Sequence, residues 1–88
     1  MLSNDQKQRI IKIAQKNGTH TTRNKSLEEV AEYKEALESN DTYAIIDEIA
    51  DILITAYQEI YHLNIKKEVE DRLEHKIART EQRLSICN

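Results

Sequence analysis

The chain has 88 residues, of which 33% are charged, with a formal net charge of −3, no proline, one glycine and one cysteine. This length allows one domain with a modest core, the near absence of proline and glycine excludes a sheet-rich fold, and the single cysteine excludes an internal disulfide and fits a reducing compartment. Because no apolar run approaches the roughly 20 residues that span a bilayer and the N-terminus resembles no signal peptide, we expect residues 1–88 to form one soluble, cytoplasmic, all-α domain.

The first predicted helix begins at Ser3. Ser3 and Gln6 have the spacing of a capping box, in which each side chain pairs with the backbone N–H of the other residue. Apolar residues then recur with helical spacing as far as Asn17 and Gly18, a pair that is typical of a helix end. The polar segment 18–25 is predicted to be a loop.

Three further helices are predicted after this loop. Ser26 and Glu29 form a second capping-box pattern, so a helix is expected over 27–38. The third helix is expected over 42–61 and the fourth over 65–84. The connection between the second and third helices is short, which favours antiparallel packing. The sequence thus predicts four helices in an antiparallel bundle.

Two pairs of acidic residues lie on the second and third predicted helices. Glu29 and Glu32 form one pair, and Glu48 and Asp51 form the other. Residues three apart on a helix are neighbours, so each pair points two carboxylates the same way. No lysine or arginine occurs over residues 35–65, so carboxylates that meet there repel one another unless a cation joins them. Mg²⁺ binds carboxylate and phosphate oxygens, and the pattern therefore predicts a magnesium site.

The fourth predicted helix carries a basic stripe. Its members are Arg72, Lys76, Arg79 and Arg83. Their spacings of four, three and four place them on one side of a helix, beside apolar residues such as Leu73 and Ile77 that are expected to face the core. Basic groups near a carboxylate–metal centre are well placed to hold phosphate oxygens. Pairing with acids such as Glu68 is the alternative for this stripe.

At the acidic pairs the sequence resembles the MazG-like nucleotide pyrophosphatases of the all-α NTP pyrophosphatase superfamily, in particular small single-domain members from bacteria and phages. The family signature is E-x-x-E followed, after a variable spacer, by E-x-x-D. Glu29 with Glu32 and Glu48 with Asp51 match it. The resemblance implies that these four residues are catalytic and bind Mg²⁺. It also implies hydrolysis of a ribo- or deoxyribonucleoside triphosphate to the monophosphate and pyrophosphate.

The resemblance further implies the substrate contacts and the assembly. Lys76, Arg79 and Arg83 are expected to contact the phosphates of the nucleoside triphosphate. Members of the family associate as homodimers or homotetramers that complete a four-helix core. We therefore expect homo-oligomerisation to complete the bundle of this chain.

Several choices stay open at the level of sequence. An acid outside the metal ligands is expected to orient or deprotonate the attacking water, and Glu28, Glu35 and Asp47 are equal candidates. The segment 18–25 matches no base-reading motif, so the nucleobase is open. A related pyrophosphatase acting on another substrate, such as phosphoribosyl-ATP, and a non-catalytic helical dimerisation module are the alternatives. Nucleic-acid binding is disfavoured, because residues 28–59 contain ten acidic residues and one basic residue and no recognition motif is present.

Overall fold

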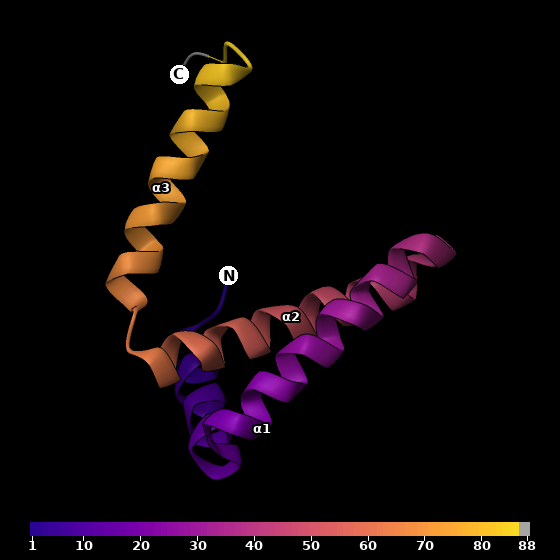
Figure 1. The fold of residues 1–88 in the computed structure, drawn as a ribbon, viewed down its shortest axis with the longest axis vertical. Coiled ribbons are helices and arrows are strands. Elements are labelled where there is room, and N and C mark those ends of the chain that lie inside the picture. Colours follow the sequence, from indigo (N-terminus) through magenta and orange to yellow (C-terminus); the bar gives the residue numbers. More distant parts are fainter. Residues whose placement is uncertain (87–88) are drawn as a thin grey trace.

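Three α-helices make up the fold. The computed structural model describes residues 1–86, so Cys87 lies outside the described residues. Within them, α1 spans Asn4–Ser39, α2 spans Thr42–Leu63 and α3 spans Lys66–Arg83, with no strand (Figure 1). The predicted all-α class is confirmed, whereas the prediction of four helices is wrong. None of the helices in this part of the chain combines the length and the apolar character that a membrane span requires.

A kink at Gly18 stands in place of the predicted loop. Gly18 has φ 83° and ψ 168°, a backbone conformation that glycine adopts far more readily than other residues. Helical structure resumes immediately after it, so the predicted loop over 18–25 and the predicted helix start at Ser26 are both wrong. Ser26 lies inside α1, and its buried Oγ has no hydrogen-bond partner among the described residues. Gly18 therefore interrupts the helical backbone of α1 at one residue, and the helical segments on its two sides run in different directions (Figure 1).

Contacts with α2 hold the first turns after the kink in the helical conformation. Thr22 is completely buried, and its Oγ1 lies 3.0 Å from Nε2 of His62. Arg23 donates two hydrogen bonds to Oε2 of Glu59, at 2.9 and 3.2 Å. These partners are 36 to 40 residues away along the chain, so the local propensities of the polar segment gave no sign of them.

Replacing Gly18 by alanine is expected to destabilise the fold by about 1–3 kcal/mol, because an alanine is strained at this φ. Lack of space is not the cause, since no atom lies within 4 Å of the position that the added Cβ would take. Urea denaturation followed by circular dichroism measures the loss, and Thr19→Ala at the neighbouring exposed position serves as the control. Equal stability of the two variants would contradict the strain argument.

Caps define the start of α1 and the turn into α2. The predicted box at Ser3 is confirmed, because its Oγ accepts from the backbone N of Gln6 at 3.0 Å and its own N donates to Oε1 of Gln6 at 2.9 Å. Asn40 ends α1 in the left-handed conformation, with φ 60°. Asp41 then caps α2 by accepting from the backbone N of Tyr43 at 3.0 Å. This tight turn lets α2 run back along α1 (Figure 1).

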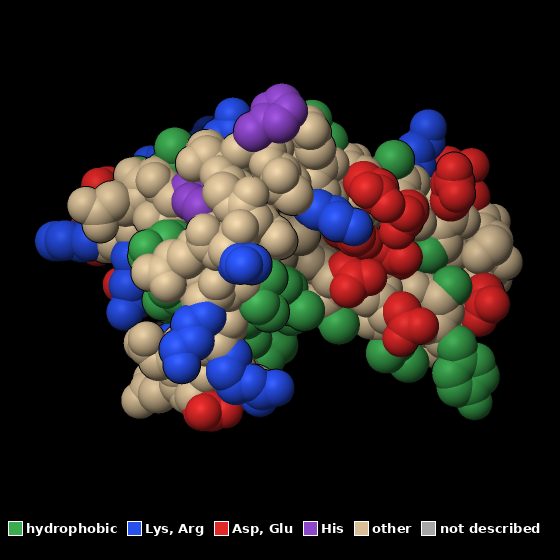
Figure 2. Space-filling model, turned by 90° about the horizontal axis from the view of Figure 1, so that it is seen from below, with side chains coloured by type: hydrophobic (Ala, Val, Ile, Leu, Met, Phe, Trp, Pro, Cys, Tyr) green, Lys and Arg blue, Asp and Glu red, His purple; other side chains and the backbone are tan. Residues whose placement is uncertain are grey.

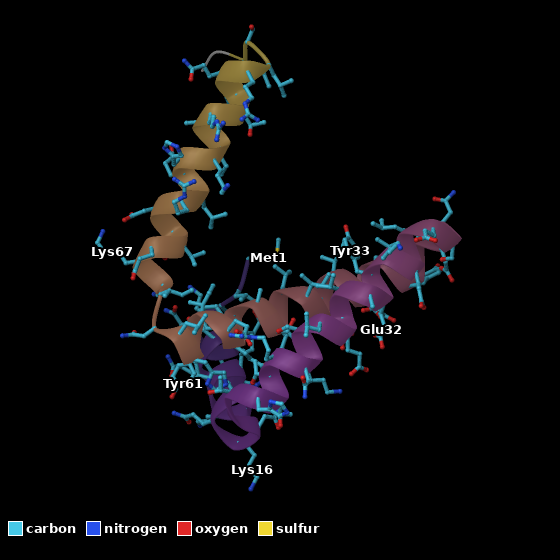
Figure 3. The ribbon with its side chains drawn as sticks, viewed as in Figure 1. Met1, Lys16, Glu32, Tyr33, Tyr61 and Lys67 are labelled. Atoms are coloured by element: carbon cyan, nitrogen blue, oxygen red, sulfur yellow. The ribbon has the colours of Figure 1, made fainter. Side chains whose placement is uncertain are left out.

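The core lies between α1 and α2 and is small. Its buried apolar residues are Ile10, Ala14 and Ala36. α3 extends away from this pair of helices (Figures 1 and 3). The prediction that Leu73 and Ile77 face the core is therefore wrong within one chain, where each is 55% exposed.

Candidate metal centre

The return of α2 along α1 brings the two predicted acidic pairs together. Glu29, Glu48 and Asp51 offer carboxylate oxygens that all lie within 4.8 Å of one another. Glu28, Glu29 and Glu32 form a second group that meets the same limit. Glu29 belongs to both groups and joins them into one assembly. We call it the carboxylate cluster, and its members are Glu28, Glu29, Glu32, Glu48 and Asp51. Figure 2 shows acidic side chains gathered on one side of the face that it draws, and Figure 3 labels Glu32 on α1.

Two oxygens of the carboxylate cluster are buried without a partner. Glu29 is only 9% exposed, although it carries a carboxyl group. Its Oε2 atom and the Oε2 atom of Glu48 are both buried and accept no hydrogen bond from the described residues. A buried carboxylate oxygen that has lost its water without gaining a donor is costly. The cluster therefore has free coordinating atoms that a bound positive group would satisfy.

Three carboxyl groups of the carboxylate cluster have raised pKa values. Burial raises the pKa of the Glu29 carboxyl, and the neighbouring carboxyl of Glu48 and the charge of Asp51 raise it further. Burial also raises the pKa of Glu48, where the neighbouring carboxyl of Glu29 opposes the shift and the charges of Glu32 and Asp51 add to it. The pKa of Glu32 is raised by burial and by the charges of Glu29 and Glu28. Each shift marks a site where negative charge lacks compensation.

The donor set suits a hard divalent cation. Among the described residues, no lysine or arginine forms an ion pair with a member of the carboxylate cluster. All of its ligand atoms are carboxylate oxygens, which Mg²⁺ and Ca²⁺ prefer, whereas Zn²⁺ sites are built mainly from histidine and cysteine. The unpartnered oxygens of Glu29 and Glu48 and the absence of a neutralising side chain fit such an ion.

In the absence of a metal ion, the stability of the fold is expected to rise as the pH falls from 7 toward about 4.5. The folded protein raises the pKa values of Glu29, Glu32 and Glu48 above their ordinary value of 4.5. Folding therefore takes up protons in this range, and the stability present at low pH is lost as the pH rises through the raised pKa values. Urea denaturation in EDTA at a series of pH values measures this slope.

The matched control for the pH series is Glu29→Gln, which removes the most buried acid of the carboxylate cluster. This variant is expected to depend less on pH than the unaltered protein over the same range. A stability that falls on acidification, or an identical slope in the two proteins, would contradict the electrostatic reading of the cluster.

The predicted phosphate contacts lie elsewhere in the chain. Lys76, Arg79 and Arg83 are exposed and belong to α3, which extends away from the helices that carry the carboxylate cluster (Figure 1). Within one chain, the structure therefore brings the four predicted acids together but does not bring these three basic residues to them.

Two polar residues beside the carboxylate cluster were missed by the sequence analysis. A pocket next to Glu29 and Asp51 is also lined by Lys25 and Gln58. Gln58 follows Asp51 by seven residues, and this helical spacing was available within the predicted third helix. Lys25 precedes Glu29 by four residues, but the predicted loop concealed that they share one face of a helix.

Comparison with known families identifies the domain. The family model described as the MazG nucleotide pyrophosphohydrolase domain matches residues 17–84. No curated protein and no solved structure gives a match. The matched segment makes up more than half of the chain and includes the whole carboxylate cluster and all of α3. The chain therefore belongs to the family of MazG nucleotide pyrophosphohydrolase domains.

Proposed function

We propose that the protein is a Mg²⁺-dependent nucleoside triphosphate pyrophosphohydrolase that converts a ribo- or deoxyribonucleoside triphosphate into the monophosphate and pyrophosphate. The observation that carries this proposal is the meeting of Glu29 with Glu48 and Asp51 within 4.8 Å, with two buried oxygens unpartnered. The family match supports the reaction class. A polyphosphate substrate and a cluster of carboxylates repel each other unless a divalent cation lies between them.

Four members of the carboxylate cluster would hold the metal ion: Glu29, Glu32, Glu48 and Asp51. When bound, Mg²⁺ would polarise the phosphate oxygens and offset the charge that develops during cleavage. The reaction adds water to one of the two phosphorus atoms that flank the α,β-bridging oxygen, and this oxygen leaves with the other phosphate. The proton released by the water requires an acceptor.

We propose Glu28 as the residue that orients the water and takes its proton. Of the three acids that the sequence left open, Glu28 shares a carboxylate group with Glu29 and Glu32, whereas Glu35 and Asp47 belong to neither group. Glu28 is exposed, so water reaches its carboxylate directly. Glu28 lies beside the proposed metal ligands but is not one of the four residues that match the family signature. This position suits a proton acceptor.

The remaining substrate contacts and the assembly are part of the same proposal. Several large apolar side chains are exposed on the described surface, among them Val30, Ile46, Leu73, Ile77 and Leu84. Their burial against further copies of the chain would stabilise a homodimer or homotetramer. In such an assembly, Lys76, Arg79 and Arg83 of α3 would contact phosphates at the carboxylate cluster of a neighbouring copy.

We further propose that residues 1–88 act as a single domain. The segment before residue 17 lies outside the family match, but it packs on α2. Gln15 donates a hydrogen bond to the hydroxyl of Tyr61 at 2.9 Å, and Ile10 and Ala14 are buried.

The test of the proposed function is pyrophosphate release from a panel of ribo- and deoxyribonucleoside triphosphates, with phosphoribosyl-ATP included, in Mg²⁺ and in EDTA. Release that requires Mg²⁺ supports the proposal, and the panel ranks the substrates. Sedimentation equilibrium on the same sample measures the oligomeric state. No release from any compound by the folded protein would overturn the enzymatic assignment and favour a helical interaction module.

A further inference from the structure

Ser26 lies on the face of α1 that packs against α2. It follows Thr22 by four residues and precedes Glu29 by three, and helical side chains with these spacings share one face. Thr22 is completely buried and contacts His62, and Glu29 is buried beside Glu48. Ser26 is half-buried between these two contacts, and its Oγ atom is buried. The side chain therefore lies in the same interface between α1 and α2 as Glu29.

The hydroxyl of Ser26 lacks the partner that other hydroxyls in these helices have. Ser39, Thr55 and Thr80 each donate to a backbone oxygen three or four residues earlier, at 2.8, 3.1 and 2.9 Å. This local bond is the usual way to pair a hydroxyl inside a helix. The Oγ atom of Ser26 is buried and forms no hydrogen bond with the described residues. Because burying an unpaired hydroxyl is costly, the arrangement indicates a partner that Ser26 gains in another state of the protein.

Glu29 offers the complementary group. Among the described residues, the buried side-chain atoms without a partner are Oγ of Ser26 and one carboxyl oxygen each of Glu29, Glu48 and Glu59. A hydroxyl always carries a donor hydrogen, and an ionised carboxylate only accepts. Helical side chains tilt toward the N-terminus, so the long side chain of Glu29 reaches back over the turn that holds Ser26. Rotation of these two side chains would pair two buried groups that are otherwise unsatisfied.

A neutral donor suits a metal ligand better than a charged one. The hydroxyl of Thr55 already donates to the backbone, and Arg23 is paired with Glu59 at 2.9 Å. A lysine at the position of Ser26 would neutralise the carboxylate of Glu29 and repel the cation. A hydroxyl orients the carboxylate and leaves its negative charge available to the metal ion. Hydrogen bonds of this kind fix the orientation of metal ligands in proteins and raise the affinity for the metal.

We propose that Ser26 positions Glu29 for the divalent cation, its hydroxyl donating a hydrogen bond to the Glu29 carboxylate when the carboxylate cluster is loaded. This inference rests on the metal site of the proposed function and adds a residue to it. Ser26 is a positioning residue, because it acts on the cation through Glu29. Its hydroxyl is unpaired in the protein without metal, so the hydrogen bond is gained on loading and adds to the affinity for the cation.

The test is isothermal titration of the EDTA-treated and desalted protein with Mg²⁺ alone, so that no nucleotide is needed. Ser26→Ala is expected to weaken Mg²⁺ binding roughly tenfold, the lower end of the range for groups that support metal ligands. Ser26→Thr keeps the hydroxyl and is expected to restore most of the affinity. Thr21→Ala, which removes an exposed hydroxyl from the same helix, is the matched control and is expected to bind as the unaltered protein does. Unchanged affinity in Ser26→Ala would overturn the proposal.

Thermal unfolding in EDTA separates positioning from support of the fold. Ser26→Ala removes a buried unpaired hydroxyl, so its melting temperature without metal is expected to equal or exceed that of the unaltered protein. Affinity for Mg²⁺ and stability without metal are thus expected to move independently, which a purely structural role would not produce. A lower melting temperature of Ser26→Ala in EDTA would overturn the proposal, since Ser26 would then stabilise the protein without metal.

A double-mutant cycle tests whether Ser26 acts through Glu29. In a Glu29→Ala background, Ser26→Ala is expected to cause no further loss of Mg²⁺ affinity, because the acceptor is gone. In a Glu48→Gln background, which retains Glu29, Ser26→Ala is expected to weaken binding again. Full additivity with Glu29→Ala would overturn the positioning role, since Ser26 would then act on the cation without Glu29.

Failure of this inference is distinguishable from failure of the proposed function. Pyrophosphate release by the unaltered protein is measured in parallel. If the unaltered protein binds Mg²⁺ and releases pyrophosphate while Ser26→Ala binds Mg²⁺ equally well, only the role of Ser26 is wrong. If Ser26→Ala weakens Mg²⁺ binding as expected but the unaltered protein releases no pyrophosphate, only the proposed reaction is wrong. An unaltered protein that binds no Mg²⁺ would overturn both.

Discussion

Replacing Glu48 by glutamine is expected to lower Mg²⁺-dependent pyrophosphate release by at least about 10²–10³-fold while leaving the helical content intact. Glu48 shares a carboxylate group with Glu29 and Asp51, and its buried Oε2 has no partner among the described residues. Glutamine has nearly the same shape but replaces one ligand oxygen with an N–H donor and removes a negative charge. Loss of a metal ligand is expected to exceed the 10–100-fold effects seen for groups that only support ligands.

The matched control for this variant is Glu70→Gln, at an exposed site on α3 outside the carboxylate cluster. It is expected to retain the activity of the unaltered protein. Initial rates of pyrophosphate release on the best substrate of the panel, with circular dichroism of each protein, make the comparison. A Glu48→Gln variant that retains full activity would remove the carboxylate cluster from the reaction.

Mg²⁺ is expected to raise the melting temperature at pH 7 by roughly 10–20 °C at a concentration of 100 times its dissociation constant. At that concentration, an ion that binds only the folded protein adds about 2.7 kcal/mol to the free energy of unfolding, and a domain of this size gains about 4–8 °C per kcal/mol. The physical source is the burial of these carboxyl groups together with the repulsion between them, which raise the pKa values of Glu29, Glu32 and Glu48 in the folded state. Thermal unfolding in Mg²⁺ and in EDTA measures the difference.

Two controls belong to this measurement. NaCl at matched ionic strength separates binding from screening, since salt alone weakens repulsion between exposed charges. Glu48→Gln is expected to lose most of the Mg²⁺ effect, because it lacks one ligand of the cluster. Identical melting curves of the unaltered protein in Mg²⁺ and in EDTA would contradict a metal site at these carboxylates.

Local sequence patterns were sufficient to predict part of the structure. The capping box of Ser3 with Gln6 depends on residues three apart, and the structure confirms it. The ends of α2 and α3 fall within two residues of the predicted ones. The spacing of the acidic pairs also depends on helix geometry alone, which is why their side chains share a face as expected.

The prediction of a loop over 18–25 was wrong because it rested on local sequence patterns. The contacts that hold this segment in a helix join residues that are far apart in the chain. Polar residues after a glycine are typical of a loop, yet Thr22 and Arg23 are held in a helix by His62 and Glu59 of α2. The error had a consequence for the candidate site. Because segment 18–25 was predicted to be a loop, the analysis missed Lys25, which lies one helical turn before Glu29 and lines the pocket next to Glu29 and Asp51.

The sequence by itself determined the all-α class, the family signature and the two acidic pairs, because these depend on composition and on spacings within single helices. Only the tertiary structure decided which side chains meet. It placed Glu29 against Glu48 and Asp51, left two of their oxygens unpartnered, and set Gln58 in a pocket beside them. It also directed α3 away from the cluster. These features depend on the kink at Gly18 and on the packing of α1 against α2, and contacts between residues far apart in the chain leave no local pattern in the sequence.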